Sequence, residues 1–560
     1  MGAGLQFDPK DAGVFPGHRE VFGTACTLDD LLSLIRRFGV EDWILHLSRL
    51  ATLLAGSRHR PGEYADDFFR FVVPQDHPIR QWFGVVEPGG ARRFLFMDRH
   101  VGILIELAIL HAPREAPQRM EPGGQIVNAL LMLEDLDVPP ETPSTPDEWA
   151  AFFATHLARS QLVAPMSILA RGFYLYQISS ATKSEAALKW AELFRRATAT
   201  DLDAYFAGGL VALVLTFAKT PEQIAGVVGP LPAIVTGNCG VKLQDVPGAY
   251  YSRRCKCLEE IAECIRHLEG NSNPNEFNLI PLQRFPLFRK QGVGVLPLYL
   301  SGVATSLCEG IYQEIITAAL PPEKKITESL QDIGSVFGYL FEEYVLGLLE
   351  ETFGCTRVLK KPKRSDNGNE AADGILICPE GIIVMQIKGR HVRGRDRFAW
   401  KCVEDAEADV RQTGLVDAVD QLVSRESLAS CRKGLVAELA FGSLANMVIQ
   451  PVVVTYEPVP LLGLALPVVQ DQIRRVPLGP RDRPLIIVNV DELEALCSLP
   501  GGDTVWEVLQ KFRSWSGSQT RTLRNFLFET RRLRDAAMVY RGDRVFQSLA
   551  SSLRVEPQAS

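Results

Sequence analysis

Apolar residues recur at helical spacing through much of the first half of the chain. From Trp149 to His267 they fall three and four residues apart, which predicts a mostly helical region. A second such pattern runs from Ala304 to Ala319 and ends at Pro321-Pro322. Between the two, the short apolar runs Phe285–Arg289 and Val293–Leu298 flank a glycine and predict a hairpin.

Turn-forming residues divide this half of the sequence. The runs Gln81–Val86 and Arg93–Met97 flank a Pro-Gly-Gly stretch, which predicts another hairpin. Prolines at 139, 140 and 143 then interrupt the pattern, and Thr145 with Pro146 fits the start of a helix.

The pattern changes after residue 326. The stretch Phe337–Phe353 has one apolar face and is followed by Gly354, which predicts a helix with a glycine stop. Ala372–Cys378 and Ile382–Lys388 are strand-like and are joined by a Pro-Glu-Gly turn. Five further elements are expected: a short strand at Thr356–Leu359, a helix at Asp417–Val423, strands at Met447–Tyr456 and Leu485–Val490, and a helix from Asp491.

The length of 560 residues corresponds to about three or four domains at the usual domain size. We expect a multidomain α+β protein with a mostly helical N-terminal half, an α/β core with a mixed sheet flanked by helices, and a basic helical C-terminal segment. The expected divisions are 1–140, 141–270, 271–330, 331–500 and 501–560.

Several polar residues accompany the helix and the hairpin after residue 326. Glu342 and Glu343 lie beside the apolar face of the helix, where an acidic pair is most often simply solvated. Asp373 opens the first strand, and Gln386 and Lys388 share a face of the second. Hairpin pairing would bring Asp373 toward both. Burying an Asp and a Lys there is costly unless each has a partner, and a metal ion bridged to a phosphate would supply one.

This order of elements and residues resembles the PD-(D/E)XK nuclease superfamily, which has the restriction-endonuclease-like fold. The helix reads Gly338-Tyr339-Leu340-Phe341-Glu342-Glu343-Tyr344-Val345, and Asp373 is followed thirteen residues later by Gln-x-Lys. A Gln in this position, with such a helix before it, is most similar to the Mrr-like branch. The resemblance covers about Ser335 to Leu499 and includes the family's α-β-β-β-α-β order.

The resemblance implies a role for each of four residues. Asp373 would be the central carboxylate ligand of Mg²⁺ or Mn²⁺, Gln386 would ligate through its amide oxygen, and Glu342 would ligate directly or through water. Lys388 would orient the attacking water and offset charge on the phosphate. The neutral Gln386 removes one negative charge from the site, so a nuclease-like domain without activity stays an alternative.

The net charge of −7 excludes a protein that coats nucleic acid by overall positive charge. Charge is unevenly distributed, however, because residues 357–401 hold eleven Lys and Arg against five Asp and Glu. A nucleic acid could contact this stretch beside the scissile phosphate, although a solvated loop would look the same. The candidate contacts are Lys361, Lys363, Arg390, Arg393, Arg395, Arg397 and Lys401.

Residues 511–544 form a second basic stretch with nine Lys and Arg against three Asp and Glu. Trp515, Phe526 and Phe528 lie in it, and we expect them to pack in the core rather than to stack on bases.

Other classes of protein find little support. The longest apolar run, Gly209–Ala218, is too short for a membrane span, and the N-terminus lacks a secretory pattern. Eleven dispersed cysteines favour reduced thiols in a cytoplasmic protein. A zinc-like spacing joins Cys255, Cys257, Cys264 and His267. On a predicted helix, however, their side chains would not point toward one common metal position. No Walker or Gly-x-Ser-x-Gly motif is present.

We therefore expect a metal-dependent endodeoxyribonuclease, the effector of a bacterial genome-defence system, with the first 330 residues sensing a trigger or acting as a scaffold. The defence role is implied by the resemblance only. A silent DNA-binding or scaffold subunit and an RNA-cleaving effector are the alternatives. Expected partners are DNA, a protein that contacts the N-terminal half, and a second copy of the chain, with no membrane.

Overall fold

A computed structural model gives the fold of the protein. The residues that the structure describes are 17–57, 73–80, 98–115, 118–120, 123–137, 165–216, 246–269, 279–290, 294–319, 329–389, 407–408, 410–411, 414–424, 428, 431, 433, 436, 448–456, 467–476, 483–499, 504–515, 523, 526–527 and 530. The hairpin predicted at residues 81–97, the break at 139–144 and the helix start at Thr145 lie outside them.

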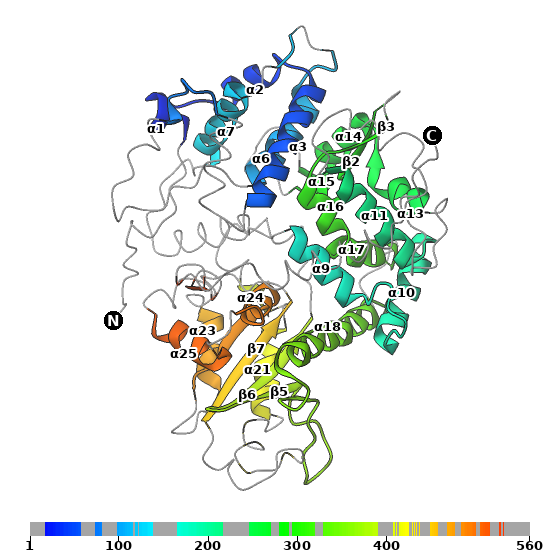
Figure 1. Ribbon diagram of the computed structural model, residues 1–560, viewed down its shortest axis with the longest axis vertical. Coiled ribbons are helices and arrows are strands. Elements are labelled where there is room, and N and C mark those ends of the chain that lie inside the picture. The colour runs from blue at the N-terminus through cyan, green and yellow to red at the C-terminus, as the bar shows by residue number, and fades with distance from the viewer. Residues whose placement is uncertain are drawn as a thin grey trace, which may run out of the picture.

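A first group of helices builds its own apolar core, with Trp43 and Leu104 fully buried at its centre. Most of the group comes from the N-terminal segment, shown in blue and cyan in Figure 1, and two members come from later in the chain. The helices are α1 (His18–Phe22), α2 (Leu28–Ile35), α3 (Val40–Ser57), α6 (Asp98–His111), α7 (Gly124–Asp137), α14 (Leu258–Glu269) and α15 (Ile280–Arg284).

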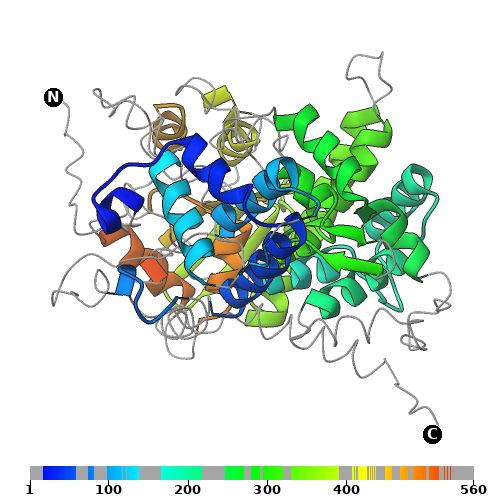
Figure 2. The ribbon, with the colours of Figure 1, turned by 90° about the horizontal axis from the view of Figure 1, so that it is seen from above.

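A second group of helices follows in the middle of the chain. Its members are α9 (Pro165–Leu175), α10 (Glu185–Thr198), α11 (Leu202–Thr216), α13 (Val246–Arg254), α16 (Leu300–Ser306) and α17 (Glu309–Ala319). Helix α3 of the first group contacts α16 of the second, so the two groups lie side by side (Figures 1 and 2). The described part of 149–267 is mostly helical, as predicted.

A small three-stranded sheet belongs to the same region. Strands β2 (Leu287–Lys290) and β3 (Gly294–Pro297) pair antiparallel, which confirms the predicted hairpin. The two-residue strand β1 (Cys255–Lys256) pairs with β2 in parallel and was not predicted. Two residues carry too little periodicity to be recognised as a strand in a sequence.

The helix predicted from Ala304 to Ala319 is confirmed over Glu309–Ala319 (α17), but a break between α16 and α17 separates its first residues from the rest. At the break, the Tyr176 hydroxyl donates to the Cys308 carbonyl at 2.6 Å. The Arg254 guanidinium donates to the Gly310 carbonyl at 3.2 Å. Both of these carbonyls also belong to the first turn of α17, whereas the Ser306 carbonyl, which a continuous helix would bond internally, accepts from the Tyr205 hydroxyl at 3.3 Å. Tertiary contacts therefore outweigh the local helical pattern.

The second half of the chain contains a mixed five-stranded sheet in the order β4-β5-β6-β7-β8. The first three strands pair antiparallel and the last three pair in parallel. Their bounds are β4 Val358–Lys360, β5 Gly374–Cys378, β6 Gly381–Lys388, β7 Val448–Thr455 and β8 Ile486–Asn489. All five strands were predicted, with ends that differ by a few residues.

Helices cover both faces of this sheet. One face carries α18 (Ser329–Phe353), which contacts β6 and β4, and α24 (Val490–Leu496), which contacts β7 and β8. The other face carries α21 (Leu415–Ser424), which contacts β6 and β7 and packs on α23 (Pro467–Arg475). Gly354 ends α18 with a φ of +88°, a conformation that glycine adopts without strain, so the predicted glycine stop is confirmed.

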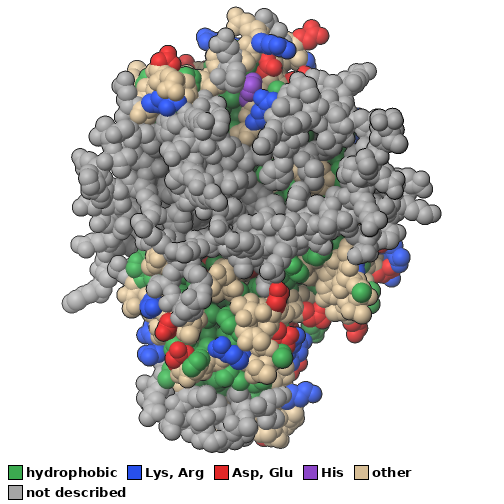
Figure 3. Space-filling view, viewed as in Figure 1, with side chains coloured by type: hydrophobic (Ala, Val, Ile, Leu, Met, Phe, Trp, Pro, Cys, Tyr) green, Lys and Arg blue, Asp and Glu red, His purple; other side chains and the backbone are tan. Residues whose placement is uncertain are grey.

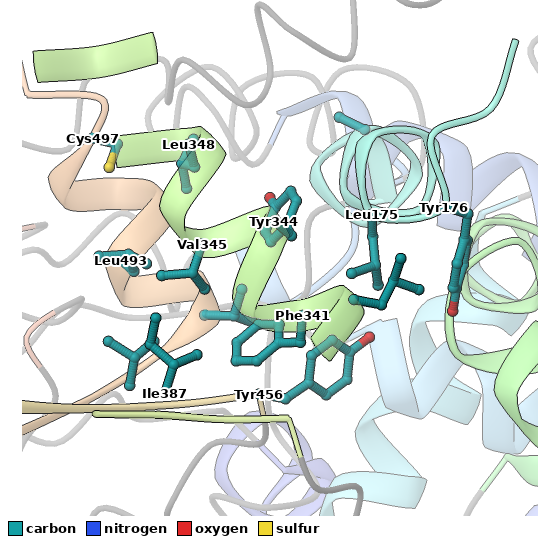
Figure 4. Close-up of a cluster of buried hydrophobic side chains, with 14 of the residues drawn as sticks. Leu175, Tyr176, Phe341, Tyr344, Val345, Leu348, Ile387, Tyr456, Leu493 and Cys497 are labelled. Atoms are coloured by element: carbon teal, nitrogen blue, oxygen red, sulfur yellow. The ribbon is translucent and has the colours of Figure 1, made fainter. Parts of the chain in front are cut away.

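Alternate residues of β6 point to these two layers. Ile387 packs with Phe341 and Val345 of α18 and with Leu493 of α24, as Figure 4 shows. Val384, one of the residues that point the other way, lies in the core that the α21 side chains complete. Gln386 and Lys388 have the same parity as Val384, so the strand directs them toward the layer of α21.

The core under α18 also includes the second group of helices. Leu175 and Tyr176 of the α9 segment approach α18 from the side opposite α24 (Figure 4). The helix α25 (Val505–Ser514) joins the same core, and Trp515 packs against Phe512 and Phe526. The predicted packing of Trp515 and Phe526 is confirmed, whereas Phe528 lies outside the described residues.

The fold is thus a mixture of many helices with one mixed five-stranded sheet, as expected for an α+β chain. The detailed domain boundaries stay a prediction. Among the described residues, no helix is long and apolar enough to cross a membrane.

Candidate active site

The α18 helix places Glu342 beside the edge of the sheet. The Glu342 side chain is only 13% exposed, and its Oε1 lies 3.0 Å from the ammonium nitrogen of Lys361, which follows β4. Glu343 points elsewhere, because the Ser184 hydroxyl at the start of α10 donates to its carboxylate at 2.5 Å. The interpretation of the pair as a solvated acidic face is therefore wrong for Glu342.

The register of the β5–β6 hairpin places Asp373 against Gln386. Gly374 pairs with Met385, so Asp373, one residue earlier, comes opposite Gln386, one residue later. The N–H of Ile387 donates to Asp373 Oδ2 at 2.7 Å, and the Asp373 carbonyl accepts from the N–H of Lys361 at 3.0 Å. Both ends of Asp373 are thereby fixed, and the residue is 7% exposed.

The side-chain amide of Gln386 is fully buried against the Asp373 carboxylate. One end of the amide lies 2.8 Å from Asp373 Oδ2, 3.2 Å from Oδ1 and 3.0 Å from Gln421 Oε1. With its nitrogen at that end, Gln386 donates to these oxygens and the cluster is satisfied without a cation. With its oxygen there, four oxygen atoms face one another, an arrangement that needs a cation among them.

Gln421 connects this cluster to Lys388. The Lys388 ammonium donates to Gln421 Oε1 at 2.5 Å, and the same oxygen is the one that faces Gln386. The structure therefore brings Asp373, Gln386 and Lys388 together through a residue of α21. Gln421 was not among the predicted site residues. The sequence offered only a weak indication of it, namely a polar residue next to Leu422, which packs in the core between α21 and the sheet.

Glu342 and Lys361 influence each other's protonation. Burial raises the pKa of Glu342 above its usual value, the Lys361 ammonium opposes this rise, and the nearby Asp373 carboxylate adds to it. Burial disfavours the charged form of Lys361, but its hydrogen bond to Glu342 and the carboxylates of Glu370 and Asp373 together raise its pKa. Because the Asp373 carboxylate contributes to the pKa of both Glu342 and Lys361, the charges of these three residues are coupled.

The donors of this cluster are suited to a hard cation. Octahedral Mg²⁺ binds oxygen at about 2.1 Å, which separates neighbouring ligand oxygens by about 3.0 Å. The distances of 2.8, 3.2 and 3.0 Å around the Gln386 amide match that separation, and they match hydrogen bonds donated by its nitrogen equally well. Across the described ranges, no three His, Cys, Asp or Glu side chains gather into a metal-binding group. A metal here would therefore depend on the amide oxygen of Gln386 as well as on Asp373.

A glycine lets α18 approach the end of β6 at the site. A Cβ atom on Gly389 would lie 2.9 Å from Phe341 Cβ and 3.1 Å from Gly338 Cα. Only a residue without a side chain allows this contact. Gly389 directly follows Lys388, and Gly338 lies one helical turn before Glu342. The contact holds the helix that carries Glu342 against the strand that carries Lys388.

The predicted nucleic-acid contacts are only partly described. Lys361 pairs with Glu342, and Lys363 lies in an isolated bridge with Glu370 beyond β4. On the face in Figure 3, the described basic side chains are interspersed with acidic ones. The remaining candidates, Arg390, Arg393, Arg395, Arg397 and Lys401, lie outside the described residues.

A buried polar cluster joins the site helix to the N-terminal half. Arg171 of α9 donates through Nε to Glu494 Oε1 at 2.7 Å and through Nη2 to Oε2 at 2.8 Å, and it also pairs with Asp491. The Tyr344 hydroxyl of α18 donates to the same Glu494 at 2.7 Å. Arg171 is 4% exposed, so the carboxylates of Glu494 and Asp491 replace water in stabilising its positive charge.

Comparison with known proteins gives no match: no protein-family model, no curated protein and no solved structure is similar to this chain. The resemblance to the nuclease superfamily therefore stays a prediction from the sequence.

Proposed function

We propose that the chain is a metal-dependent nuclease that hydrolyses phosphodiester bonds of DNA. The observation that carries the proposal is the hairpin register, which sets Asp373 against Gln386 while Gln421 holds Lys388 beside them. A carboxylate, an amide oxygen and an ammonium on one sheet edge are the groups that a metal ion and a phosphate require.

In this proposal Asp373 and Gln386 hold Mg²⁺ or Mn²⁺, and Glu342 contributes from α18 directly or through water. The cation, when bound, would polarise the phosphoryl oxygen and acidify its water. The Lys388 ammonium lies on the same side of the sheet as Gln386, where it would orient the attacking water and offset negative charge on the phosphate. Gln421 orients the Lys388 ammonium, because its oxygen accepts from that nitrogen at 2.5 Å.

A silent nuclease-like DNA-binding or scaffold subunit is the second candidate, and one observation favours it. With its nitrogen toward Asp373, the Gln386 amide satisfies the carboxylate as well as Gln421, so the cluster needs no cation to be stable. An acid in that position would have made the metal obligatory. Cleavage of RNA instead of DNA is a variant of the first candidate, since the same groups serve either backbone.

The helical N-terminal half is proposed to sense a trigger or to act as a scaffold for the nuclease, as the effector of a bacterial genome-defence system. Support comes from the shared core between the second group of helices and α18, and from Arg171, which binds Glu494 beside Tyr344. Through these contacts a change in the helical half would reach the helix that carries Glu342.

A plasmid-nicking assay with the full-length chain and Mg²⁺ or Mn²⁺ tests the proposal. Asp373→Asn keeps an oxygen for the Ile387 N–H and the same volume, so it should fold while nicking is lost. Asp366→Asn, in an exposed loop paired with Arg364, should nick like the wild type. Equal nicking by the wild type and Asp373→Asn would overturn the assignment.

A mobility-shift measurement on the same proteins separates the two candidates. Binding of DNA by a wild-type protein that never nicks with either metal would favour the silent subunit. Parallel reactions with single-stranded RNA would identify an RNA-cleaving effector.

A further inference from the structure

Tyr339 is an exposed aromatic residue on α18, where it belongs to an exposed stripe that also contains Asp332, Ser335 and Glu343. Its side chain is 58% exposed, more than any other large apolar residue in the described ranges, whereas Phe337, Leu340 and Phe341 around it are fully buried. An exposed tyrosine alone is ordinary on a protein surface. This one lies three residues before Glu342, which places both on the same side of α18.

Lys361 connects the Tyr339 ring to the candidate active site. Its ammonium nitrogen lies 5.2 Å from the centre of the ring and 3.0 Å from Glu342 Oε1. One cation therefore contacts both the exposed ring and the carboxylate of the site. The Lys361 side chain is 39% exposed, so a ligand can reach it from solvent.

The backbone of Lys361 is held in an uncommon conformation. Its φ is +45°, in the left-handed region, which is unfavourable for a residue other than glycine. Its N–H donates to the Asp373 carbonyl at 3.0 Å, so the strained residue is anchored on the central carboxylate residue of the site. This anchoring fixes the start of the side chain and directs its ammonium between Tyr339 and Glu342.

The end of β6 lies beside the same turn of α18. Gly389 approaches Gly338, the neighbour of Tyr339, so closely that a Cβ on Gly389 would fall 3.1 Å from Gly338 Cα. Tyr339 therefore stands at the point where the chain leaves Lys388. An aromatic ring and a cation are therefore exposed next to the buried Asp373, whose carbonyl accepts from the Lys361 N–H.

We propose that Tyr339 is a stacking surface for an unpaired nucleobase next to the scissile phosphate, and that Lys361 contacts the phosphate backbone of that nucleotide. The inference rests on the proposed function and narrows its substrate to single-stranded or locally opened nucleic acid. In an intact duplex each base is covered by its neighbours, so only an unstacked base can lie on the ring. The Lys361 cation favours an anionic chain over an uncharged partner.

The test is binding by the full-length chain to a fluorescently labelled single-stranded oligodeoxynucleotide and to a hairpin duplex, measured by anisotropy with Ca²⁺ in place of Mg²⁺. Stacking by one aromatic residue corresponds to about a 5- to 150-fold change in affinity. Tyr339→Ala should weaken single-strand binding within that range, and duplex binding by less than about twofold. Tyr339→Phe should bind like the wild type, because the ring is retained.

Tyr174→Ala is the matched control, since Tyr174 is also exposed, at 37%, and its ring contacts Phe173 of the same helix. It should bind single strands like the wild type. A photo-crosslink from a single strand that carries 5-iodouracil should map to Tyr339. Equal loss of single-strand and duplex binding in Tyr339→Ala, no loss at all, or no single-strand binding by the wild type would each overturn the inference.

Failure of this inference and failure of the proposed function give different results. If Asp373→Asn abolishes nicking while Tyr339→Ala leaves single-strand binding unchanged, the nuclease stands and the stacking surface does not. If binding depends on Tyr339 but no metal supports nicking, the stacking surface stands and the hydrolytic chemistry does not.

Discussion

The Gln386 amide lies 2.8 Å from Asp373 Oδ2, close enough either to donate a hydrogen bond to that carboxylate or to share a cation with it. The two arrangements differ only in which end of the amide faces Asp373. The first is complete in the protein alone, and the second needs a metal. The choice between them determines whether the site is poised for catalysis or satisfied by itself.

Gln386→Glu should make the site depend on a metal. The new carboxyl cannot donate when ionised, so it faces Asp373 as a like charge, and folding without metal should weaken by about 1–3 kcal/mol. Mg²⁺ should then raise the melting temperature more than it does in the wild type. Gln450→Glu is the control, because Gln450 of β7 is also fully buried but donates to the carbonyls of Pro451 and Pro484. A Mg²⁺ response equal in both variants would contradict the metal site.

Lys361→Met should move metal binding to higher pH. Burial raises the pKa of Glu342 above 4.5 in the folded protein and the Lys361 ammonium opposes this rise, so its removal lets Glu342 keep its proton to higher pH. Mg²⁺ affinity, followed by calorimetry across pH, should therefore fall on the acidic side and recover at alkaline pH. Lys360→Met is the neighbouring control, since Lys360 pairs instead with Glu350. An unchanged pH profile in Lys361→Met would show that Glu342 does not take part.

Gly389→Ala should separate α18 from the end of β6. The added methyl would lie 2.9 Å from Phe341 Cβ, and overpacking of this kind typically costs about 1–3 kcal/mol of unfolding free energy. Urea unfolding measures the loss. Gly347→Ala on the same helix meets nothing within 4 Å and should instead gain about 0.5–1 kcal/mol, as alanine favours a helix over glycine. Similar stabilities for the two variants would contradict the close contact.

Arg171→Met should destabilise the junction between the helical half and the sheet. The substitution leaves Glu494 and Asp491 without their buried cation, and loss of one partner from such a group typically costs about 3–5 kcal/mol. Arg196→Ala is the control, because Arg196 forms an exposed pair with Glu192 and should change stability by less than about 0.5 kcal/mol. Denaturant unfolding of both variants tests the difference.

The linear pattern was sufficient for the five strands of the second half and for α18, α21 and α24, whereas α23 was not predicted. The alternation in β6 and the apolar face of α18 are local properties, and the hairpin turn after Cys378 allows only a narrow choice of register. The approach of Asp373 to Gln386 was therefore predictable, and the structure confirms it. The resemblance to a nuclease rests on the same local features.

Other features were decided only by tertiary structure. At the break between α16 and α17, the Ser306 carbonyl is satisfied by the Tyr205 hydroxyl, which comes from an element far away in the sequence. The separate environments of Glu342 and Glu343 depend on Lys361 and Ser184 in the same way. Gln421 reaches Lys388 and Gln386 only because α21 packs on β6. The sequence determines which side chains an element presents on each face, since that follows from backbone periodicity. Which partners meet those faces depends on how distant segments pack, and no local pattern encodes it.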